Sequence, residues 1–254
     1  MINRYLYLRL ILELRSSTNV LLNFEYYSKV QGFVYSILRN TSFHYLHDKI
    51  GYKFFSFSNI FKIKNNTDNN LFCLLISSPS SKLIREIGYY LQNIKDYHIP
   101  IEIGNIFELD SFRILDANLS FPLKLITASP IIIRIPAKRF SKDSDNQYPY
   151  RIIYWRSSHS IDLFIEHLES NLKKKYYEFC SHKINERLFE QFTFKKQVST
   201  RILIGDRSIP IIGSLWEFCF FKHIKQDFQL FALDCGLGER NSMGFGFVNP
   251  IKDK

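Results

Sequence analysis

Apolar and polar positions alternate near the start of the chain. One set of alternate positions is entirely leucine: Leu6, Leu8, Leu10, Leu12 and Leu14. The other set is aromatic or charged and includes Tyr5, Tyr7, Arg9 and Glu13. Successive residues of a strand point to opposite faces, so this pattern predicts a strand with one core face and one polar, aromatic face.

The next segments change between helical and extended patterns. Helical spacing predicts helices over residues 26–38 and 83–94, with the first apolar stripe formed by Tyr26, Val30, Phe33, Val34, Ile37 and Leu38. Strands are expected over 53–61, 71–76 and 101–115, with a turn over 65–70. The resulting order, β-α-β-β-α-β, is typical of a ferredoxin-like unit. We expect this unit to end near residue 125.

The second half repeats part of this pattern. A strand is expected over 131–135, a polar insertion over 136–150 and a long helix over 160–180. Strands are expected over 189–196, 200–205, 209–221 and 228–235. The sequence therefore predicts an α+β protein with two tandem ferredoxin-like (RRM-like) domains, residues 1–125 and 126–254. The second domain is expected to be degenerate, with its second helix reduced or lost.

Composition and charge restrict the class of partner. The chain has 254 residues, a formal net charge of +10 and 46% hydrophobic residues, which is ample for a core. The basic charge suits a polyanion, although an acidic membrane or solubility alone would also account for it. Four scattered cysteines without a Cys-x-x-Cys pair argue against a zinc site. Without an uncharged apolar run of about 18 residues, we expect no membrane span and a cytoplasmic location.

A glycine-rich segment near the C-terminus offers a candidate anion site. Gly236 and Gly238 flank Leu237, and after five residues Gly244 and Gly246 flank Phe245. Such a loop can present bare N–H groups, and Arg240, to an anion. A dinucleotide fingerprint is excluded because no helix opens after the loop, and a P-loop because the chain has no Gly-Lys dipeptide. A wide turn without a ligand remains the alternative.

Three residues near the first helix are candidates for proton transfer and charge stabilisation. Tyr35 lies on the polar side of the helix, and His47 would be about 18 Å away on one straight helix. The segment Asn40-Thr41-Ser42 favours a break. A short helix over 43–49, ended by Gly51, would bring Tyr35, His47 and Lys53 together. His44 competes with His47 for the same role.

The two ends of the chain together resemble one family. The pattern Gly-apolar-Gly-x5-Gly-apolar-Gly, with Leu46-His47-Asp48 and Lys53 after a tyrosine-bearing helix, resembles the CRISPR-associated endoribonucleases that cut repeat RNA. They belong to the repeat-associated mysterious protein (RAMP) superfamily of RNA-binding proteins. The resemblance implies two ferredoxin-like units, the catalytic set Tyr35, His47 and Lys53, and RNA binding by the loop residues Gly236, Gly238, Arg240, Gly244 and Gly246.

Other basic residues are candidates for RNA binding. Arg134, Lys138 and Arg139 lie in a basic stretch interleaved with the aromatic residues Tyr148, Tyr150, Tyr154 and Trp155. Phosphate contacts combined with base stacking suit such a mixture, although a solvated loop is an equal alternative. The run Lys173-Lys174-Lys175 is expected to be solvated, because the inner face of its helix is already explained.

The resemblance implies cleavage of CRISPR precursor RNA by its own 2′-hydroxyl, without a metal or cofactor. Repeat RNA is the expected partner, a CRISPR effector complex is a further candidate, and the protein is expected to be a monomer or homodimer. A non-catalytic RNA-binding subunit of a guide-RNA complex is the main alternative. A sheet binder that uses Tyr5, Tyr7 and Arg9 is a more distant one.

Overall fold

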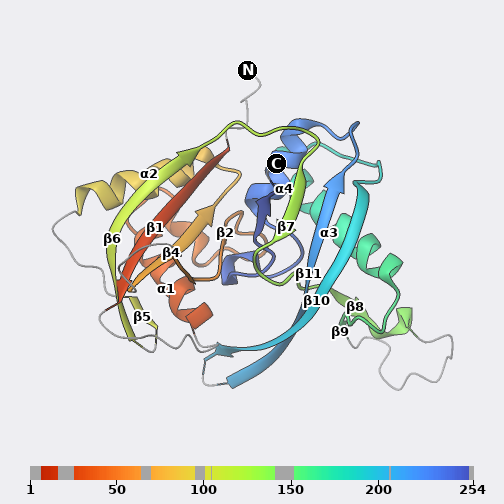
Figure 1. Ribbon diagram of the computed structural model, residues 1–254, viewed down its shortest axis with the longest axis horizontal. Coiled ribbons are helices and arrows are strands. Elements are labelled where there is room, and N and C mark those ends of the chain that lie inside the picture. The colour runs from red at the N-terminus through yellow and green to blue at the C-terminus, as the bar shows by residue number, and fades with distance from the viewer. Residues whose placement is uncertain are drawn as a thin grey trace.

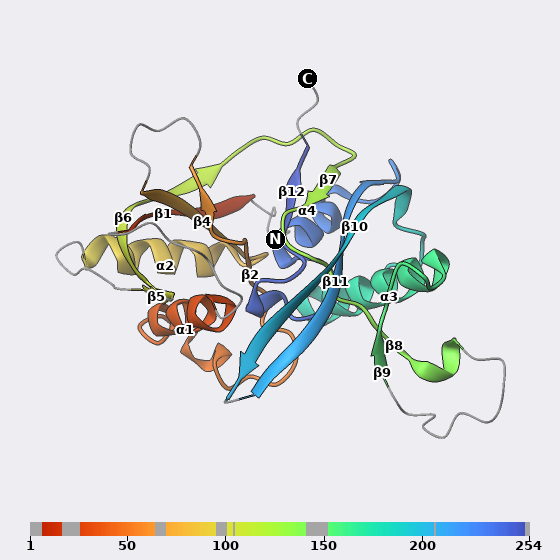
Figure 2. The same ribbon diagram turned by 60° about the horizontal axis from the view of Figure 1, so that its bottom comes forward.

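The computed structural model describes residues 7–16, 26–63, 70–94, 101–103, 105–140, 152–205 and 207–251. Two units lie side by side, each with a sheet toward the viewer in Figure 1 and helices behind it. Turning the molecule places α1 and α2 beneath the first sheet (Figure 2). The α+β class with two ferredoxin-like units is confirmed.

The first unit follows the predicted order. Its elements are β1 Leu8–Ser16, α1 Tyr26–Leu38, β2 Ser56–Phe57, β3 Phe61–Lys62, β4 Leu71–Ser77, α2 Ser81–Asn93, β5 Ile101–Ile103 and β6 Asn105–Asp116, with the 3₁₀ helix η1 at His44–Leu46. The antiparallel sheet has the order β2-β4-β1-β6-β5. Leu8, Leu10, Leu12 and Leu14 of β1 are buried in the core, as the alternation predicted.

Three local predictions in this unit need correction. The expected strand over 53–61 is reduced to the short β2 and β3, and the expected helix over 43–49 is the single turn η1. The expected strand over 101–115 is instead a tight hairpin of β5 and β6. The turn expected over 65–70 lies outside the described residues except for Asn70.

The second unit is more complete than expected. Its elements are β7 Lys124–Thr127, β8 Arg134–Pro136, β9 Ile152–Tyr154, α3 Ile161–Cys180, β10 Phe189–Ile204, β11 Arg207–Phe220, α4 Gln226–Cys235 and β12 Val248–Pro250, with 3₁₀ helices η2 at Ala137–Arg139 and η3 at Asn241–Met243. The sheet order is β10-β11-β7-β12. When β3, β5 and the separate β8–β9 pair are left out and the remaining strands are numbered within each unit, both sheets have the order 2-3-1-4. The β8–β9 hairpin and η2 are inserted after its first strand.

The strand predicted over 228–235 is wrong, because this segment is the helix α4. Phe228, Phe231, Ala232 and Cys235 recur at helical spacing and are all buried. The side chain of Gln229 is buried too, and it accepts from the Leu123 N–H and donates to the Ile224 carbonyl. The second helix is therefore present and packs in the core of its unit. The strands expected over 189–196 and 200–205 are one continuous strand, β10.

The two units share buried contacts. Ile202 of β10 and Ile211 of β11 belong to the hydrophobic core of the first unit. The proposed boundary between residues 125 and 126 falls inside β7, which pairs with β11 and β12 of the second sheet. The division into domains 1–125 and 126–254 thus stays a prediction, with β7 shared across its boundary.

The face of the first strand that was predicted to be polar and aromatic is covered at Arg9. The Arg9 side chain is 1% exposed and donates to Asn249 Oδ1 at 2.5 Å and to the carbonyls of Val248 at 2.6 Å and Leu233 at 3.2 Å. Asp234 Oδ1 lies 3.9 Å from its Nε. Tyr7 is buried as well. Because the second unit covers this part of the sheet, Tyr7 and Arg9 cannot form an open RNA-binding surface, and Tyr5 lies outside the described residues.

Candidate active site

The turn after α1 brings the candidate residues together. Thr41 Oγ1 donates to the Leu38 carbonyl and accepts from the Phe43 N–H, so the helix ends where the sequence predicted a break. Glu86 of α2 accepts from the Ser42 N–H at 2.7 Å and from the Ser42 hydroxyl at 2.8 Å. These contacts hold the turn before η1 against α2. Gly51 then reverses the chain with a φ of +97°, a conformation that glycine adopts readily.

Tyr35 and His47 meet at this corner. Their ring centroids are 5.1 Å apart, in an edge-to-face arrangement with planes at 77°. His47 is exposed, and its Nδ1 lies 2.6 Å from Asp48 Oδ1. His44 instead places its Nδ1 3.3 Å from the Thr41 carbonyl oxygen and packs beside Tyr45. The structure therefore places His47, and not His44, against the Tyr35 ring.

Lys53 completes the corner. Its ammonium lies 5.7 Å from the centre of the Tyr35 ring. It donates to the carbonyl oxygens of Leu46 and His47, the latter at 2.8 Å. Burial lowers the pKa of Lys53, an effect that Asp48 opposes and Lys49 reinforces. Lys53 thus both orients the backbone around His47 and supplies a positive charge beside it.

The Tyr35 hydroxyl is neutral over a wide pH range. Burial raises the pKa of Tyr35, although hydrogen bonds with the side chains of Ser242 and Gln31 oppose this rise. A neutral phenol can donate or accept a hydrogen bond, which suits orientation of a substrate hydroxyl better than its deprotonation. Ser242 belongs to the glycine-rich segment, so the two ends of the chain meet at this tyrosine.

The glycine-rich segment, residues 236–246, forms a compact loop between α4 and β12. Gly236, Gly238, Gly244 and Gly246 all have positive φ angles, as expected for glycines in tight turns. All four are buried. A side chain at Gly238 would come within 2.5 Å of the Ile132 carbonyl oxygen, and one at Gly244 within 2.5 Å of the Phe57 ring. The loop is therefore packed against both units.

Many loop N–H groups are used inside the protein, in contrast to the expected bare N–H groups. Leu237 N–H donates to the Gly246 carbonyl, Glu239 N–H to the Ile132 carbonyl and Gly246 N–H to the Pro130 carbonyl. The Asn241 side-chain amide donates to the carbonyls of Leu237 and Phe245. These bonds give the loop a fixed shape. Binding of RNA by the four glycines remains a prediction.

Lys175 is the residue that the sequence analysis missed. It was expected to be solvated, yet it is 1% exposed. Its ammonium donates to the carbonyls of Gly236 at 3.1 Å and Gly238 at 2.6 Å, and to Asn241 Oδ1 at 2.6 Å. Burial lowers the pKa of Lys175, while Cys235 and Glu239 act in the opposite direction. Nothing in a run of three lysines indicates which one turns inward.

A cavity of about 280 Å³ lies next to the corner. Its lining combines residues 51–55 with α3 and the loop, and includes Lys53, Arg134, Lys175, Arg240 and Ser242. Arg134 forms an ion pair with Glu239 at 2.5 Å, and Arg240 Nη1 lies 3.5 Å from Met243 Sδ. The cavity therefore gathers several cationic groups, of which Lys53 lies beside the Tyr35 ring.

The remaining candidate residues lie elsewhere. Lys138 is exposed on η2, and Arg139 forms an ion pair with Glu166 of α3 at 2.6 Å. Neither lines the cavity. Trp155 was a candidate for base stacking, but it is buried against Phe164 and Trp216. Tyr148 and Tyr150 lie outside the described residues.

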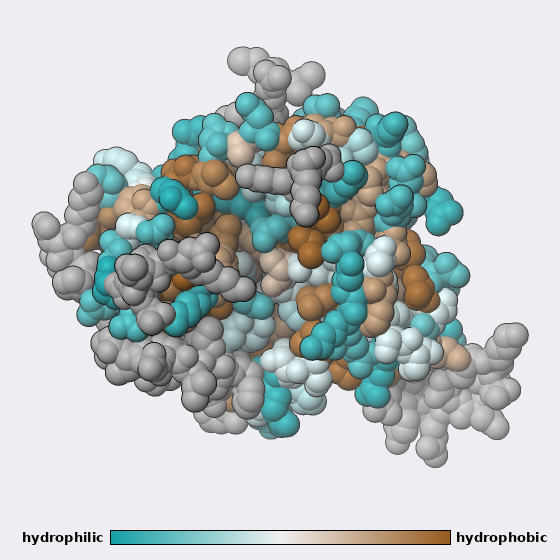
Figure 3. Space-filling view, in the orientation of Figure 1, coloured by the Kyte–Doolittle hydropathy of each residue, from teal (hydrophilic) through white to brown (hydrophobic). Residues whose placement is uncertain are grey.

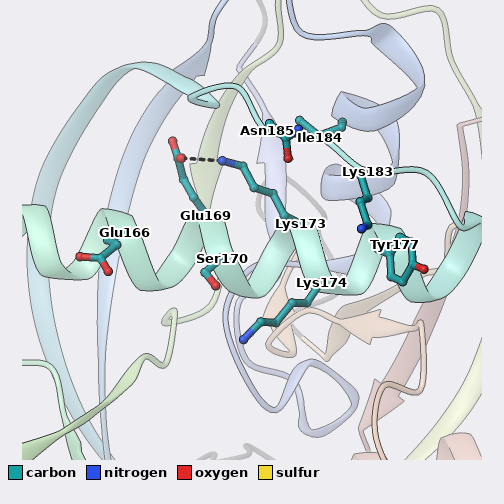
Figure 4. A pocket seen from close by; sticks show the side chains of 9 residues that line it. All are labelled: Glu166, Glu169, Ser170, Lys173, Lys174, Tyr177, Lys183, Ile184 and Asn185. Atoms are coloured by element: carbon teal, nitrogen blue, oxygen red, sulfur yellow. Dashed lines mark hydrogen bonds and ion pairs between the residues drawn. The ribbon is translucent and has the colours of Figure 1, made fainter.

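A larger hollow lies on the outer side of α3 (Figure 4). It has a volume of about 540 Å³ and is lined by both acidic and basic residues, including Glu166, Lys174 and Lys183. Lys173 is paired with Glu169 at 3.2 Å there. None of the predicted site residues lines it. On the sheet side of the molecule, Figure 3 shows apolar and hydrophilic residues intermixed.

Within the described part of the chain, no group of three or more His, Cys, Asp or Glu side chains is arranged to hold a metal ion. Among its helices, none is both long and apolar enough to cross a membrane.

Comparison with known proteins agrees with this arrangement. The profile of the family described as "CRISPR associated protein Cas6, C-terminal" matches residues 120–250. The chain is 31% identical to the CRISPR-associated endoribonuclease Cas6 2 of Methanocaldococcus jannaschii over 234 residues, 88% of this chain and 91% of the relative. It is 25% identical to the CRISPR-associated endoribonuclease Cas6 of Haloferax mediterranei, over 96% of this chain and 94% of the relative.

Solved structures share the fold. One described as "CRISPR associated protein Cas6" aligns with a TM-score of 0.70 and 24% identity, covering 96% of this chain and 99% of the other. Another, titled "An RAMP protein binding different RNA substrates", aligns with a TM-score of 0.71 and 20% identity, covering 96% and 100%. The tandem ferredoxin-like fold, the family model and the curated relatives together make this chain a CRISPR-associated endoribonuclease. The chain belongs to the Cas6 family of CRISPR-associated proteins.

Proposed function

We propose that this protein cuts CRISPR precursor RNA within its repeats, using the 2′-hydroxyl of the RNA as the nucleophile and no metal ion. The observation that carries the proposal is the convergence of Tyr35, His47 and Lys53, with the two rings 5.1 Å apart and the ammonium 5.7 Å from the tyrosine ring. The relatives are named as CRISPR-associated endoribonucleases, which supports the choice of substrate.

The reaction needs groups of these chemical types. The 2′-oxygen attacks the adjacent phosphorus while the bond from phosphorus to the 5′-oxygen breaks. A base must take the proton of the 2′-hydroxyl, and an acid must protonate the leaving 5′-oxygen. The products are a 2′,3′-cyclic phosphate and a 5′-hydroxyl. Histidine is suited to proton transfer because it titrates near neutral pH.

Each residue of the corner has a role in this proposal. His47 acts as the general acid or base, and its exposed ring can reach a bound RNA. Lys53 stabilises negative charge that develops on the phosphate. Tyr35, whose pKa is raised by burial, orients the 2′-hydroxyl as a neutral phenol. Arg240 and Arg134, which line the adjoining cavity, are placed to bind flanking phosphates, and Lys138 and Arg139 to contact RNA further away.

In this proposal the loop glycines determine the shape of the loop. Gly236, Gly238, Gly244 and Gly246 hold the turns that place Ser242 at Tyr35 and Arg240 at the cavity. The repeat RNA is the proposed partner, and a cytoplasmic location as a monomer or homodimer completes the proposal.

The test uses repeat RNA with a single 2′-deoxy substitution at the nucleotide 5′ of the scissile phosphate. The unmodified RNA should be cut in EDTA and leave cyclic phosphate and 5′-hydroxyl ends. The 2′-deoxy RNA should bind with the same affinity and stay intact. Cleavage of the 2′-deoxy RNA at the normal rate, or loss of cleavage in EDTA that added metal restores, contradicts the mechanism.

A further inference from the structure

Lys175 occupies an unusual position for a lysine. It lies on α3, and its side chain is 1% exposed. The neighbouring Lys174 is exposed, and Figure 4 shows Lys173 and Lys174 leaving the helix in different directions. Burial of an ammonium group costs free energy unless hydrogen bonds compensate for the lost water. Its position therefore depends on the three oxygen atoms that accept from it.

All three acceptors belong to the glycine-rich loop. The carbonyls of Gly236 and Gly238 and the Asn241 side-chain oxygen turn toward the ammonium, at 3.1, 2.6 and 2.6 Å. Asn241 in turn donates to the carbonyls of Leu237 at 3.0 Å and Phe245 at 2.9 Å. Lys175 is thus at the centre of a network that joins α3 to both halves of the loop.

The network continues to the catalytic corner through one residue. Ser242 directly follows Asn241 in η3, and η3 packs against α1, which carries Tyr35. The Ser242 side chain also opposes the rise in the pKa of Tyr35, as a hydrogen-bond partner of its hydroxyl does. Ser242, Lys175 and Lys53 all line the same cavity. A shift of the loop would therefore move the hydrogen-bond partner of the Tyr35 hydroxyl. A displacement of about 1 Å in a group that orients a substrate can cost about 10²-fold in rate.

We propose that Lys175 is a positioning residue for RNA cleavage, which holds the glycine-rich loop where Ser242 orients the Tyr35 hydroxyl. The proposal rests on the proposed function, because it assigns Tyr35 to the reaction. Lys175 itself touches no substrate in this scheme. It acts through Asn241, Ser242 and Tyr35 in turn.

A double-mutant cycle tests this route. Lys175→Met keeps most of the side-chain volume and removes the ammonium. In single-turnover cleavage at saturating RNA it should lower the rate by about 10²-fold. In a Tyr35→Phe background, where the hydroxyl is already absent, the same substitution should change the rate less than about threefold, because coupled residues are non-additive. Lys174→Met, with the same loss of charge on the same helix, is the matched control and should leave the rate unchanged.

Equal rate losses from Lys175→Met in the two backgrounds would overturn the proposal and leave Lys175 a role in stability alone. Ser242→Ala provides a second route if Lys175→Met does not fold. It should slow cleavage in the wild-type background and have little effect in the Tyr35→Phe background. Equal effects of Ser242→Ala in both backgrounds would likewise overturn the proposal.

Hydrogen exchange separates this proposal from the proposed function. Amides of residues 236–246 should exchange faster in Lys175→Met than in the wild type, and at the wild-type rate in Lys174→Met. Unchanged exchange in Lys175→Met contradicts the positioning role even if the enzyme is active. Failure of the proposed function would appear instead in the wild-type protein, as cleavage of the 2′-deoxy RNA, and would leave the exchange result intact.

Discussion

The rings of Tyr35 and His47 meet edge to face at a centroid separation of 5.1 Å, although the two residues are twelve positions apart in the chain. On one straight helix they would be about 18 Å apart. The helix α1 ends before Ser42, from which Glu86 accepts hydrogen bonds, and the chain turns so that His47 lies beside Tyr35. The contact between the two rings therefore depends on a turn that contains neither residue.

Replacement of the two nearby histidines should separate their roles. His47→Ala should lower the single-turnover rate by about 10²–10⁴-fold, the usual contribution of a positioned acid or base. RNA affinity should change little, because a group that transfers a proton acts in the transition state rather than in binding of the substrate. His44→Ala, one turn earlier, should cleave normally. An inactive His44→Ala protein beside a normal His47→Ala protein would reverse the assignment.

Lys53 should set the alkaline limit of activity. Its pKa is lowered by burial, so the ammonium loses its proton at a lower pH than an ordinary lysine does. The cleavage rate should fall as pH rises through that lowered pKa. Lys53→Arg keeps a charge at all accessible pH values, and whatever its rate, its alkaline decline should move to higher pH.

Lys49→Arg is the control for this pH profile. Lys49 is paired with Glu178 at 3.4 Å and is adjacent in the fold to Lys53. Its profile should match the wild type. If Lys53→Arg retains the wild-type alkaline decline, another group sets that limit.

Gly238→Val should destabilise the fold. Gly238 has a φ of +68°, and an added side chain would lie 2.5 Å from the Ile132 carbonyl oxygen. Strain at such a φ and overpacking each cost about 1–3 kcal/mol, so the melting temperature should fall by several degrees. Gly32→Ala, at a position with nothing within 4 Å of the added carbon, should not lower it. Melting curves and RNA affinities measured for the same variants check this prediction. If Gly238→Val has an unchanged melting temperature but weakened binding, the result would indicate direct contact between this glycine and RNA.

Arg240→Ala should weaken RNA binding without unfolding the protein. Arg240 lines the cavity next to Lys53 and makes no ion pair among those found in the described part of the chain. Loss of one phosphate contact should lower the slope of log affinity against log salt by about one unit. Lys225→Ala, an exposed lysine before α4, changes the net charge equally and should keep the wild-type slope. Identical salt slopes for the two variants would remove Arg240 from the RNA site.

Sequence periodicity predicted the elements that have one buried face. The helices at 26–38 and 161–180 carry apolar stripes, and both are present nearly as expected. The helix α4 was mistaken for a strand because it is buried on several sides. Phe228, Leu230 and Ala232 alternate as in a strand, while Phe228, Phe231 and Ala232 fit a helix equally well. Periodicity alone cannot separate these structures in a short apolar segment.

Two buried charged residues, Arg9 and Lys175, could not be identified from the sequence. Arg9 lies on the polar side of an alternating strand, and Lys175 lies in a run of lysines, so both patterns predict exposure. Their burial depends on residues more than 60 positions away, the carbonyls of Leu233 and Val248 for Arg9 and the loop for Lys175. Tertiary contacts of this kind leave no local signal.

The bonds of Arg9 also have a consequence for the order in which the molecule matures. The guanidinium belongs to the first strand of the sheet, while its acceptors Leu233, Val248 and Asn249 are synthesised 224 to 240 residues later. A nascent chain can form the first sheet, yet it must keep this charge hydrated until those acceptors emerge from the ribosome. The loop that carries Ser242 is made just before the last two of them. Burial of Arg9 and closure of the loop around Lys175 therefore both wait for residues that follow residue 230 in the order of synthesis.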